Sequence, residues 1–189
     1  MRSGAVRKCW MIQHRVSGQK SKHRTTCAAF LPTRRFRRST DYCSLCDMSS
    51  IHFSFNAADR LQTACLISAH HYRAGHSLGV YCANAQRLAE FDRLLWDYER
   101  AAFVPHVLQG DPLAGETPIV LYTTRPDSRH GWVLNLDDDC VPEAASFDNI
   151  IEVVARTESD RAGGRARWRA YQAGGHTIVQ HDAAANDLP

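Results

Sequence analysis

Lysine is nearly absent from this chain. Its three lysines, Lys8, Lys20 and Lys22, all lie among the first 47 residues, so every later cation is an arginine, whose planar guanidinium can pair with a carboxylate through two hydrogen bonds. Long apolar runs are also missing, since none approaches the roughly 20 residues that a membrane-spanning helix needs. No continuous apolar segment follows the N-terminal cations, as it would in a signal peptide. We therefore expect no membrane partner.

The motifs that mark common catalytic sites are absent as well. The chain has no G-x-x-x-x-G-K-[ST] loop for phosphates, no G-x-G-x-x-G after its first strand, no G-x-S-x-G elbow and no H-E-x-x-H. Catalysis has no obvious position in this sequence, and we expect no cofactor and no metal site.

The seven cysteines are an odd number in a chain that lacks a small disulfide framework, which favours free thiols in a reducing cytoplasm. Cys43-x-x-Cys46 lacks a second ligand pair at a suitable distance for zinc, so we interpret that spacing as chance. Cys65 and Cys82 lie on apolar segments and are expected in the core.

Charge divides the chain into two unlike parts. Residues 1–47 hold eleven Lys and Arg against two Asp, a net charge of +9, while the other 142 residues carry 12 Arg against 18 acids, a net charge of −6. Because phosphate contacts need clustered cations, the acidic body argues against direct nucleic-acid binding. Any DNA would be reached only indirectly, through a protein.

Residues 1–47 show no sustained periodicity, and three interpretations are open for them. They are upstream sequence foreign to the native protein, a basic tail for nucleic acid, or an Arg-rich targeting segment. We favour the first, because a folded pattern begins abruptly at Met48. The expected organisation is a disordered basic leader over 1–47, an α/β domain over 48–182 and a flexible tail over 183–189.

The body alternates strand and helix patterns. Apolar residues alternate at Ile51, Phe53 and Phe55, with the period of a strand. Further patterns predict strands at 78–82, 119–123, 132–136 and 149–155, helices at 59–74 and 85–96, a loop at 103–108, and a last helix after the final strand. This alternation predicts a mostly parallel sheet that is covered on both faces.

Three consecutive acids, Asp137, Asp138 and Asp139, follow the apolar run VLNL. They resemble the acidic end of a strand that holds Mg²⁺ beside a nucleotide, but no phosphate loop accompanies them. A solvated turn at the end of a strand is the favoured interpretation. The acids are also the main support for an alternative function, a metal-dependent phosphoesterase or nuclease.

The stretch RAGGRARWRAYQAGG, residues 161–175, is the most informative part of the chain. Arg161, Arg165 and Arg169 recur four apart beside Trp168 and Tyr171, and residues three or four apart share a helix face. The pattern predicts a helix with guanidiniums around an aromatic surface, suited to an acidic, partly apolar chain end. The alternative is a solvated arginine face, with Ala166, Ala170 and Ala173 packed inward.

Two blocks resemble the chi subunit of bacterial DNA polymerase III, an accessory protein of the clamp-loader complex. One is RLAEFDRLLWDYERAAFVPHVL, residues 87–108, in which Trp96 precedes Phe103, Pro105 and His106. The other is RARWRAYQAGG, residues 165–175, eleven residues after Val154. The opening FSFN followed by DRL at 59–61 is also similar. The likeness covers most of 48–179 and none of the first 47 residues.

The resemblance implies a three-layer α/β/α fold with a Rossmann-like sheet and no catalytic activity. It further implies two partners. The acidic C-terminal tail of the single-stranded DNA-binding protein would contact Val154, Arg165, Trp168, Arg169 and Tyr171. The psi subunit would contact Trp96, Phe103, Pro105 and His106.

The chain departs from the family pattern at three points. It carries Arg169 where members often have Lys, and Trp168 where they often have Tyr. Gly163 and Gly164 each weaken a helix by about 1 kcal/mol relative to alanine, which puts the first turn, with Arg161, in doubt.

Overall fold

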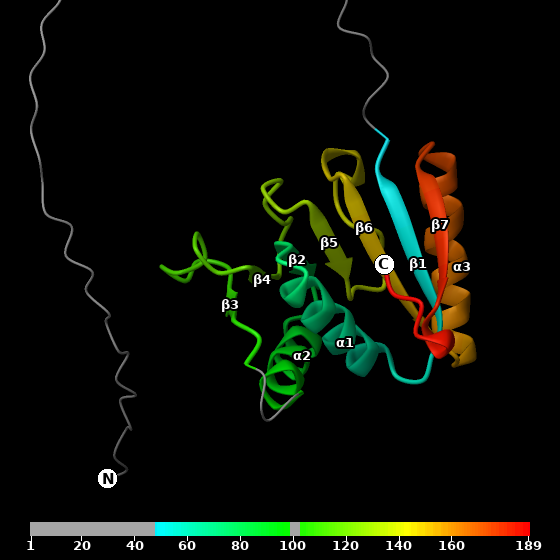
Figure 1. Ribbon diagram of the computed structural model, residues 1–189. Helices are drawn as coiled ribbons and strands as arrows, with labels where there is room; N and C mark the ends of the chain where they lie inside the picture. The colour runs from blue at the N-terminus through cyan, green and yellow to red at the C-terminus, as the bar shows by residue number, and fades with distance from the viewer. Residues whose placement is uncertain (1–47, 99–102) are drawn as a thin grey trace, which may run out of the picture. The chain divides into compact units, whose positions relative to one another are not determined.

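The computed structural model describes residues 48–98 and 103–189, and these form a seven-stranded sheet with the order β3-β4-β2-β5-β6-β1-β7 (Figure 1). Every strand pairing in it is parallel. The strands are β1 (Ser50–Ala57), β2 (Leu78–Tyr81), β3 (His106–Leu108), β4 (Ile119–Tyr122), β5 (Trp132–Asn135), β6 (Asn149–Ala155) and β7 (Thr177–Asp182). The expected parallel α/β fold is confirmed, and the basic leader with Cys43 and Cys46 lies outside the described residues.

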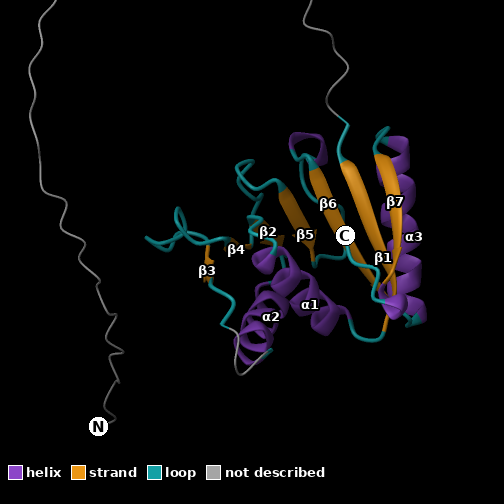
Figure 2. Cartoon of the chain, viewed as in Figure 1, coloured by secondary structure: helices purple, strands orange, loops and turns teal. Residues whose placement is uncertain are grey.

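Three α-helices cover the two faces of the sheet in the described residues, as Figure 2 shows. Helices α1 (Arg60–Arg73) and α2 (Ala85–Asp97) lie on one face, and α3 (Glu158–Ala173) lies on the other. Short 3₁₀ turns lie before β6, at η1 (Ala144–Ser146), and after β7, at η2 (Ala183–Ala185). The body thus has the three layers that the resemblance implies.

Each helix starts where the sequence supplies a capping side chain. Asp59 accepts a hydrogen bond from the backbone N–H of Gln62 at the start of α1, and Asn84 accepts from Gln86 and Arg87 at the start of α2. Such caps satisfy N–H groups that have no partner within the helix. Gly75, which follows α1, has φ +77°, a backbone conformation that glycine adopts at little cost.

Two hydrophobic clusters fill the spaces on either side of the sheet, because alternate residues of a strand point to opposite faces. Ile151 and Val153 of β6 pack on the side of α1 and α2, whereas Ile150 and Val154 pack on the side of α3. Cys65 and Cys82 are buried in the first cluster. Burial raises the pKa of the Cys65 thiol to about 12, so this thiol is a core group, as expected.

The sequence patterns missed both edge strands. β3 falls in the segment 103–108, predicted as a loop, and β7 was not predicted at all. β3 has only three residues, and β7 (TIVQHD) is exposed or half-buried throughout, so neither shows a clear apolar alternation. Within the last seven residues, 183–185 form η2 and Leu188 packs against the core. Among the described residues, no helix is long and apolar enough to cross a membrane.

Candidate functional site

Helix α3 carries the arginines and begins at a threonine cap. The side chain of Thr157 accepts a hydrogen bond from the backbone N–H of Asp160, and the acids Glu158 and Asp160 lie in the first turn, where the helix dipole favours negative charge. The helix continues through Gly163 and Gly164 to Ala173. The doubt about its first turn was therefore wrong, and Arg161 belongs to the helix.

Gly164 sets how closely α3 approaches the sheet. A Cβ atom at this position would lie 2.8 Å from Cγ2 and 3.1 Å from Cγ1 of Val154 on β6. Contacts that short are not tolerated in a packed interior without displacement of the helix or the strand. The glycine that weakens the isolated helix is thus what allows α3 to pack on β6.

A buried polar network fastens α3 to the sheet. Glu152, in the middle of β6, is fully buried and forms a salt bridge of 2.8 Å with Nε of Arg167. Its other carboxylate oxygen accepts hydrogen bonds from the Tyr171 hydroxyl at 2.9 Å and from Asn135 at 2.7 Å. The Tyr171 hydroxyl also accepts from the backbone N–H of Val141. Burial raises the pKa of this hydroxyl well above its usual range, so it remains protonated and donates.

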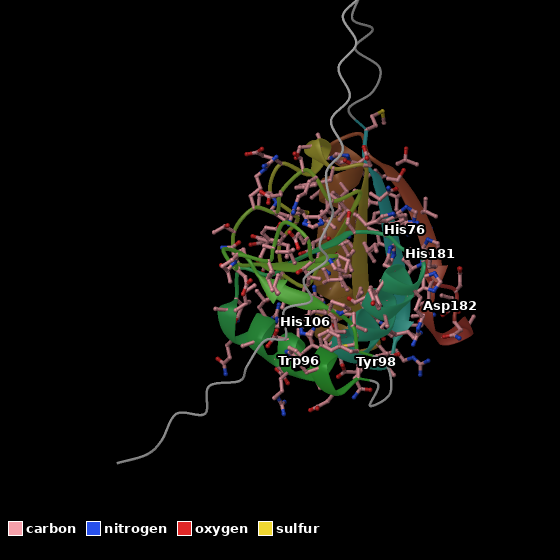
Figure 3. The ribbon with its side chains drawn as sticks, turned by 60° about the vertical axis from the view of Figure 1, so that its left-hand side comes forward. His76, Trp96, Tyr98, His106, His181 and Asp182 are labelled. Atoms are coloured by element: carbon pink, nitrogen blue, oxygen red, sulfur yellow. The ribbon has the colours of Figure 1, made fainter. Side chains whose placement is uncertain are left out.

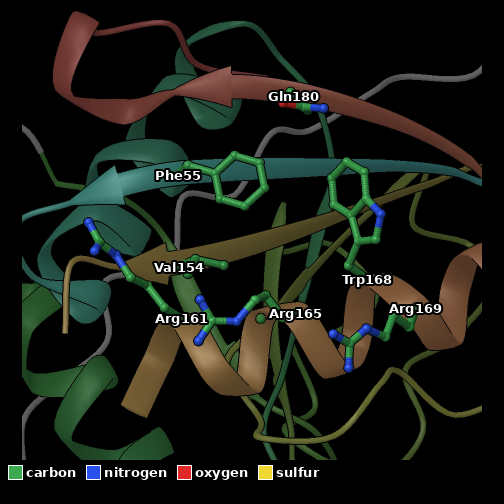
Figure 4. Close-up of a pocket in the computed structure, with 8 residues that line it drawn as sticks. Phe55, Val154, Arg161, Arg165, Trp168, Arg169 and Gln180 are labelled. Atoms are coloured by element: carbon green, nitrogen blue, oxygen red, sulfur yellow. The ribbon is translucent and has the colours of Figure 1, made fainter. Parts of the chain in front are cut away.

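A pocket of about 390 Å³ lies where α3 meets the last three strands of the sheet (Figure 4). Phe55 of β1, Val154 of β6 and Gln180 of β7 form its sheet side. Helix α3 contributes the rest of the lining: Arg161, Gly164, Arg165, Trp168 and Arg169. The ring of Trp168 lies 5.9 Å from that of Phe55 and 5.0 Å from that of Phe53, centroid to centroid. Trp168 and Phe55 therefore form an aromatic floor of the pocket, and the arginines of α3 form a cationic side.

The three pocket arginines differ in their partners. Arg165 forms a salt bridge of 2.6 Å with Glu158, and both side chains are more than half exposed. This contact is the main cause of the lowered pKa of the Glu158 carboxyl. Within the described part of the chain, Arg161 and Arg169 have no carboxylate at salt-bridge distance. Their guanidiniums are available to an anionic ligand.

Four of the five residues predicted for the acidic tail line this one pocket: Val154, Arg165, Trp168 and Arg169. Tyr171 does not line it, because its ring is only 2% exposed and its hydroxyl belongs to the Glu152 network. The inward face of α3 is Gly164, Arg167 and Tyr171. Ala166, Ala170 and Ala173 are exposed, so the alternative that packs them inward was wrong.

Sequence reasoning missed Phe55, Gly164 and Gln180 as lining residues and Arg167 as the buried cation. Helical spacing held a signal for Arg167, since positions two apart point about 200° away from each other. Arg167 therefore cannot share a face with both Arg165 and Arg169. Phe55 lies on the same side of β1 as Phe53, two residues away. No local pattern indicated that β7, with Gln180, pairs with β1 beside them.

A second cluster joins the end of α2 to the start of β3 (Figure 3). Trp96 and Phe103 are 55% and 59% exposed, with ring centroids 5.1 Å apart, and the ring of His106 lies 5.0 Å from that of Trp96. His106 is buried; its Nδ1 donates to the carbonyl of Val104, and its Nε2 lies 3.3 Å from a carboxylate oxygen of Asp92. Pro105 is half-buried. His106 thus supports an exposed aromatic pair.

Two of the three acids that follow β5, Asp137 and Asp138, are engaged by other residues of the domain. Asp138 pairs with both terminal nitrogens of Arg87 at 3.0 Å and with Arg60 at 3.3 Å. The hydrogen bonds from Arg87 hold the pKa of the Asp138 carboxyl below its usual range. Asp137 accepts a hydrogen bond from the backbone N–H of Ala83. No group of three potential metal ligands occurs among residues 48–98 and 103–189.

Comparison with known proteins shows which proteins this chain is similar to in sequence. The family model described as "DNA polymerase III chi subunit, HolC" matches residues 48–179. Proteins named DNA polymerase III subunit chi from two organisms are similar in sequence. That of Pseudomonas aeruginosa is 27% identical over 129 residues, which cover 68% of this chain and 89% of the relative. That of Escherichia coli is 26% identical over 119 residues, which cover 62% of this chain and 81% of the relative.

Proposed function

Because this chain belongs to the DNA polymerase III chi subunit family, we propose that it is a non-catalytic adaptor of the replication machinery. In this proposal it contacts the psi subunit of the clamp loader through one surface. Through another it binds the acidic C-terminal tail of the single-stranded DNA-binding protein. DNA is then reached through a protein rather than directly, as suits a body with a net charge of −6.

The observation that carries the proposal is the convergence of three arginines on an aromatic pocket. Arg161, Arg165 and Arg169 surround Trp168 and Phe55. Guanidiniums can pair with Asp side chains and with a terminal carboxylate through two hydrogen bonds each, while the aromatic floor takes an apolar ring. A chain end that combines several acids with a terminal aromatic residue fits both parts of the pocket.

The exposed aromatic pair supports the second contact. A half-exposed Trp beside a half-exposed Phe is costly in water, and such residues commonly become the central anchors of protein interfaces. Trp96 and Phe103 are separated from the tail pocket by the sheet, because α2 and α3 cover opposite faces. The two partners can therefore bind at the same time.

The metal-dependent phosphoesterase gains no support from the acids after β5. Arg60 and Arg87 already neutralise Asp138. A cation at Asp138 would have to displace two guanidiniums and would meet their positive charge. Asp138 is better explained as a link between the ends of β5, α1 and α2.

Substitution of a pocket arginine tests the tail contact. We expect Arg165→Ala and Arg169→Ala each to weaken binding of a peptide with several Asp residues and a C-terminal Phe about tenfold, because a hydrogen bond to a charged group contributes about 1.5 kcal/mol or more. Isothermal titration calorimetry at low and high salt measures the loss. Arg93→Ala, an exposed position on α2 outside the pocket, should bind like wild type. Unchanged affinity in both pocket variants would exclude this pocket.

Substitution of Phe103 tests the psi contact separately. Phe103→Ala should weaken association with psi by at least about tenfold, since truncation of an interface anchor commonly costs 2 kcal/mol or more. Binding of the acidic peptide should not change. Leu113→Ala is the matched control, because Leu113 is also about half exposed and is not among the residues assigned to psi. Equal losses of both partners in Phe103→Ala would indicate misfolding and contradict the assignment.

A further inference from the structure

The salt bridge between Glu158 and Arg165 places an acid of the protein on one of the pocket's own cations. Glu158 lies in the first turn of α3, and Arg165 follows seven residues later on the same face, two turns along the helix. The Arg165 Nη2 to Glu158 Oε1 distance of 2.6 Å is that of a short, charge-assisted hydrogen bond. In the free protein, the Arg165 guanidinium therefore already has an anionic partner.

We propose that Glu158 is an internal competitor for Arg165, which an incoming acidic peptide must displace and which thereby sets the affinity and charge selectivity of the pocket. This inference rests on the proposed function, because it concerns regulation of the same pocket. Arg161, Arg165 and Arg169 give the pocket three positive charges, and Glu158 reduces their sum to two. A ligand with a single carboxylate exchanges one anion for another at Arg165, whereas a ligand with several acids also gains the two other arginines.

The exposure of the pair makes the exchange feasible. The side chains of Arg165 and Glu158 are 57% and 76% exposed, so neither must leave a packed environment to separate. Exposed ion pairs are individually weak and are screened by salt. The displaced Glu158 carboxylate can return to water at the first turn of α3, where the helix dipole still stabilises its charge. The competitor therefore lowers affinity without blocking the pocket.

The test measures binding of a fluorescein-labelled peptide, with several Asp residues before a C-terminal Phe, to the full chain and its variants. Glu158→Gln should bind roughly two- to fivefold more tightly than wild type, the range that corresponds to an exposed ion pair, with a steeper dependence on salt. The gain should be lost in the Arg165→Ala background. Glu143→Gln is the matched control, because Glu143 forms an exposed pair of 2.8 Å with Arg125, outside the pocket, and should leave affinity unchanged.

The outcomes separate this inference from the proposed function. If wild type binds but Glu158→Gln binds equally or more weakly, Glu158 does not compete with the peptide for Arg165, while the pocket assignment stands. A gain that persists without Arg165 would also overturn it, because the effect would then be one of overall charge. If neither wild type nor Glu158→Gln binds the peptide at all, the proposed function fails and the inference fails with it.

Discussion

Replacement of Glu152 by alanine is expected to lower the free energy of unfolding by about 3 to 5 kcal/mol. The carboxylate is fully buried and is shared by Arg167, Tyr171 and Asn135. Its removal leaves the Arg167 side chain, which is only 5% exposed, as a charge in the interior without its counterion. Such a charge costs far more than the loss of a surface pair, because water cannot replace the missing partner. Urea denaturation followed by circular dichroism measures the change.

An exposed pair provides the matched comparison. Glu143→Ala removes the partner of Arg125, but these side chains are 69% and 37% exposed, and a loss of no more than about 1 kcal/mol is expected. The loss of unfolding free energy in Glu152→Gln should lie between those of Glu152→Ala and Glu143→Ala. The amide oxygen can still accept from Tyr171 and Asn135, but the negative charge is lost. If Glu152→Ala were no more destabilising than Glu143→Ala, the network would not be what holds α3 to the sheet.

Replacement of Gly164 by alanine is expected to destabilise the protein by about 1 to 3 kcal/mol and to weaken binding of the acidic peptide. The new Cβ would lie 2.8 Å from Val154, so helix or strand must shift, and overpacking of this kind has that cost. Helix propensity alone predicts the opposite, a gain of about 1 kcal/mol. Because Gly164 and Val154 both line the pocket, the shift also displaces the arginines from the aromatic floor.

Substitution of the neighbouring Gly163 distinguishes the effect of helix propensity from the effect of packing. A Cβ atom on Gly163 would lie 3.3 Å from a terminal nitrogen of Arg167 and meets nothing else within 4 Å. The gain in helix propensity and the mild crowding oppose each other, so Gly163→Ala should stay within about 1 kcal/mol of wild type. Thermal unfolding and peptide titration of both variants give the comparison. A stabilised Gly164→Ala variant with unaltered binding would contradict the close approach of α3 to β6.

The order of strands and helices was largely predictable because it follows from local periodicity. Ile51, Phe53 and Phe55 alternate within one strand, and Asn149–Ala155 forms β6 as predicted. The edge strands β3 and β7 were not predictable in the same way, because an edge strand forms by pairing with a distant neighbour and need not be apolar. The sequence contains no local sign that Thr177–Asp182 pairs with β1.

The candidate site was likewise predictable only where it depends on local spacing. Spacing indicated that Arg161, Arg165 and Arg169 share a face with Trp168, and all four line the pocket. Spacing could not indicate that Tyr171 faces the interior, because the pattern alone does not fix which side of the helix meets the sheet. That orientation depends on Glu152, fifteen residues before its partner Arg167, and on the shape of Val154 opposite Gly164.

By itself, then, the sequence determined the helices, the central strands, the family and the set of arginines on the last helix, since these follow from local patterns along the chain. Only the tertiary structure decided which arginine is buried and which arginines line the pocket. Arg165, Arg167 and Arg169 are chemically identical, and burial against a single carboxylate in the middle of β6 turns Arg167 inward. The other two remain at the surface, where Arg165 pairs with the exposed Glu158 and both line the pocket.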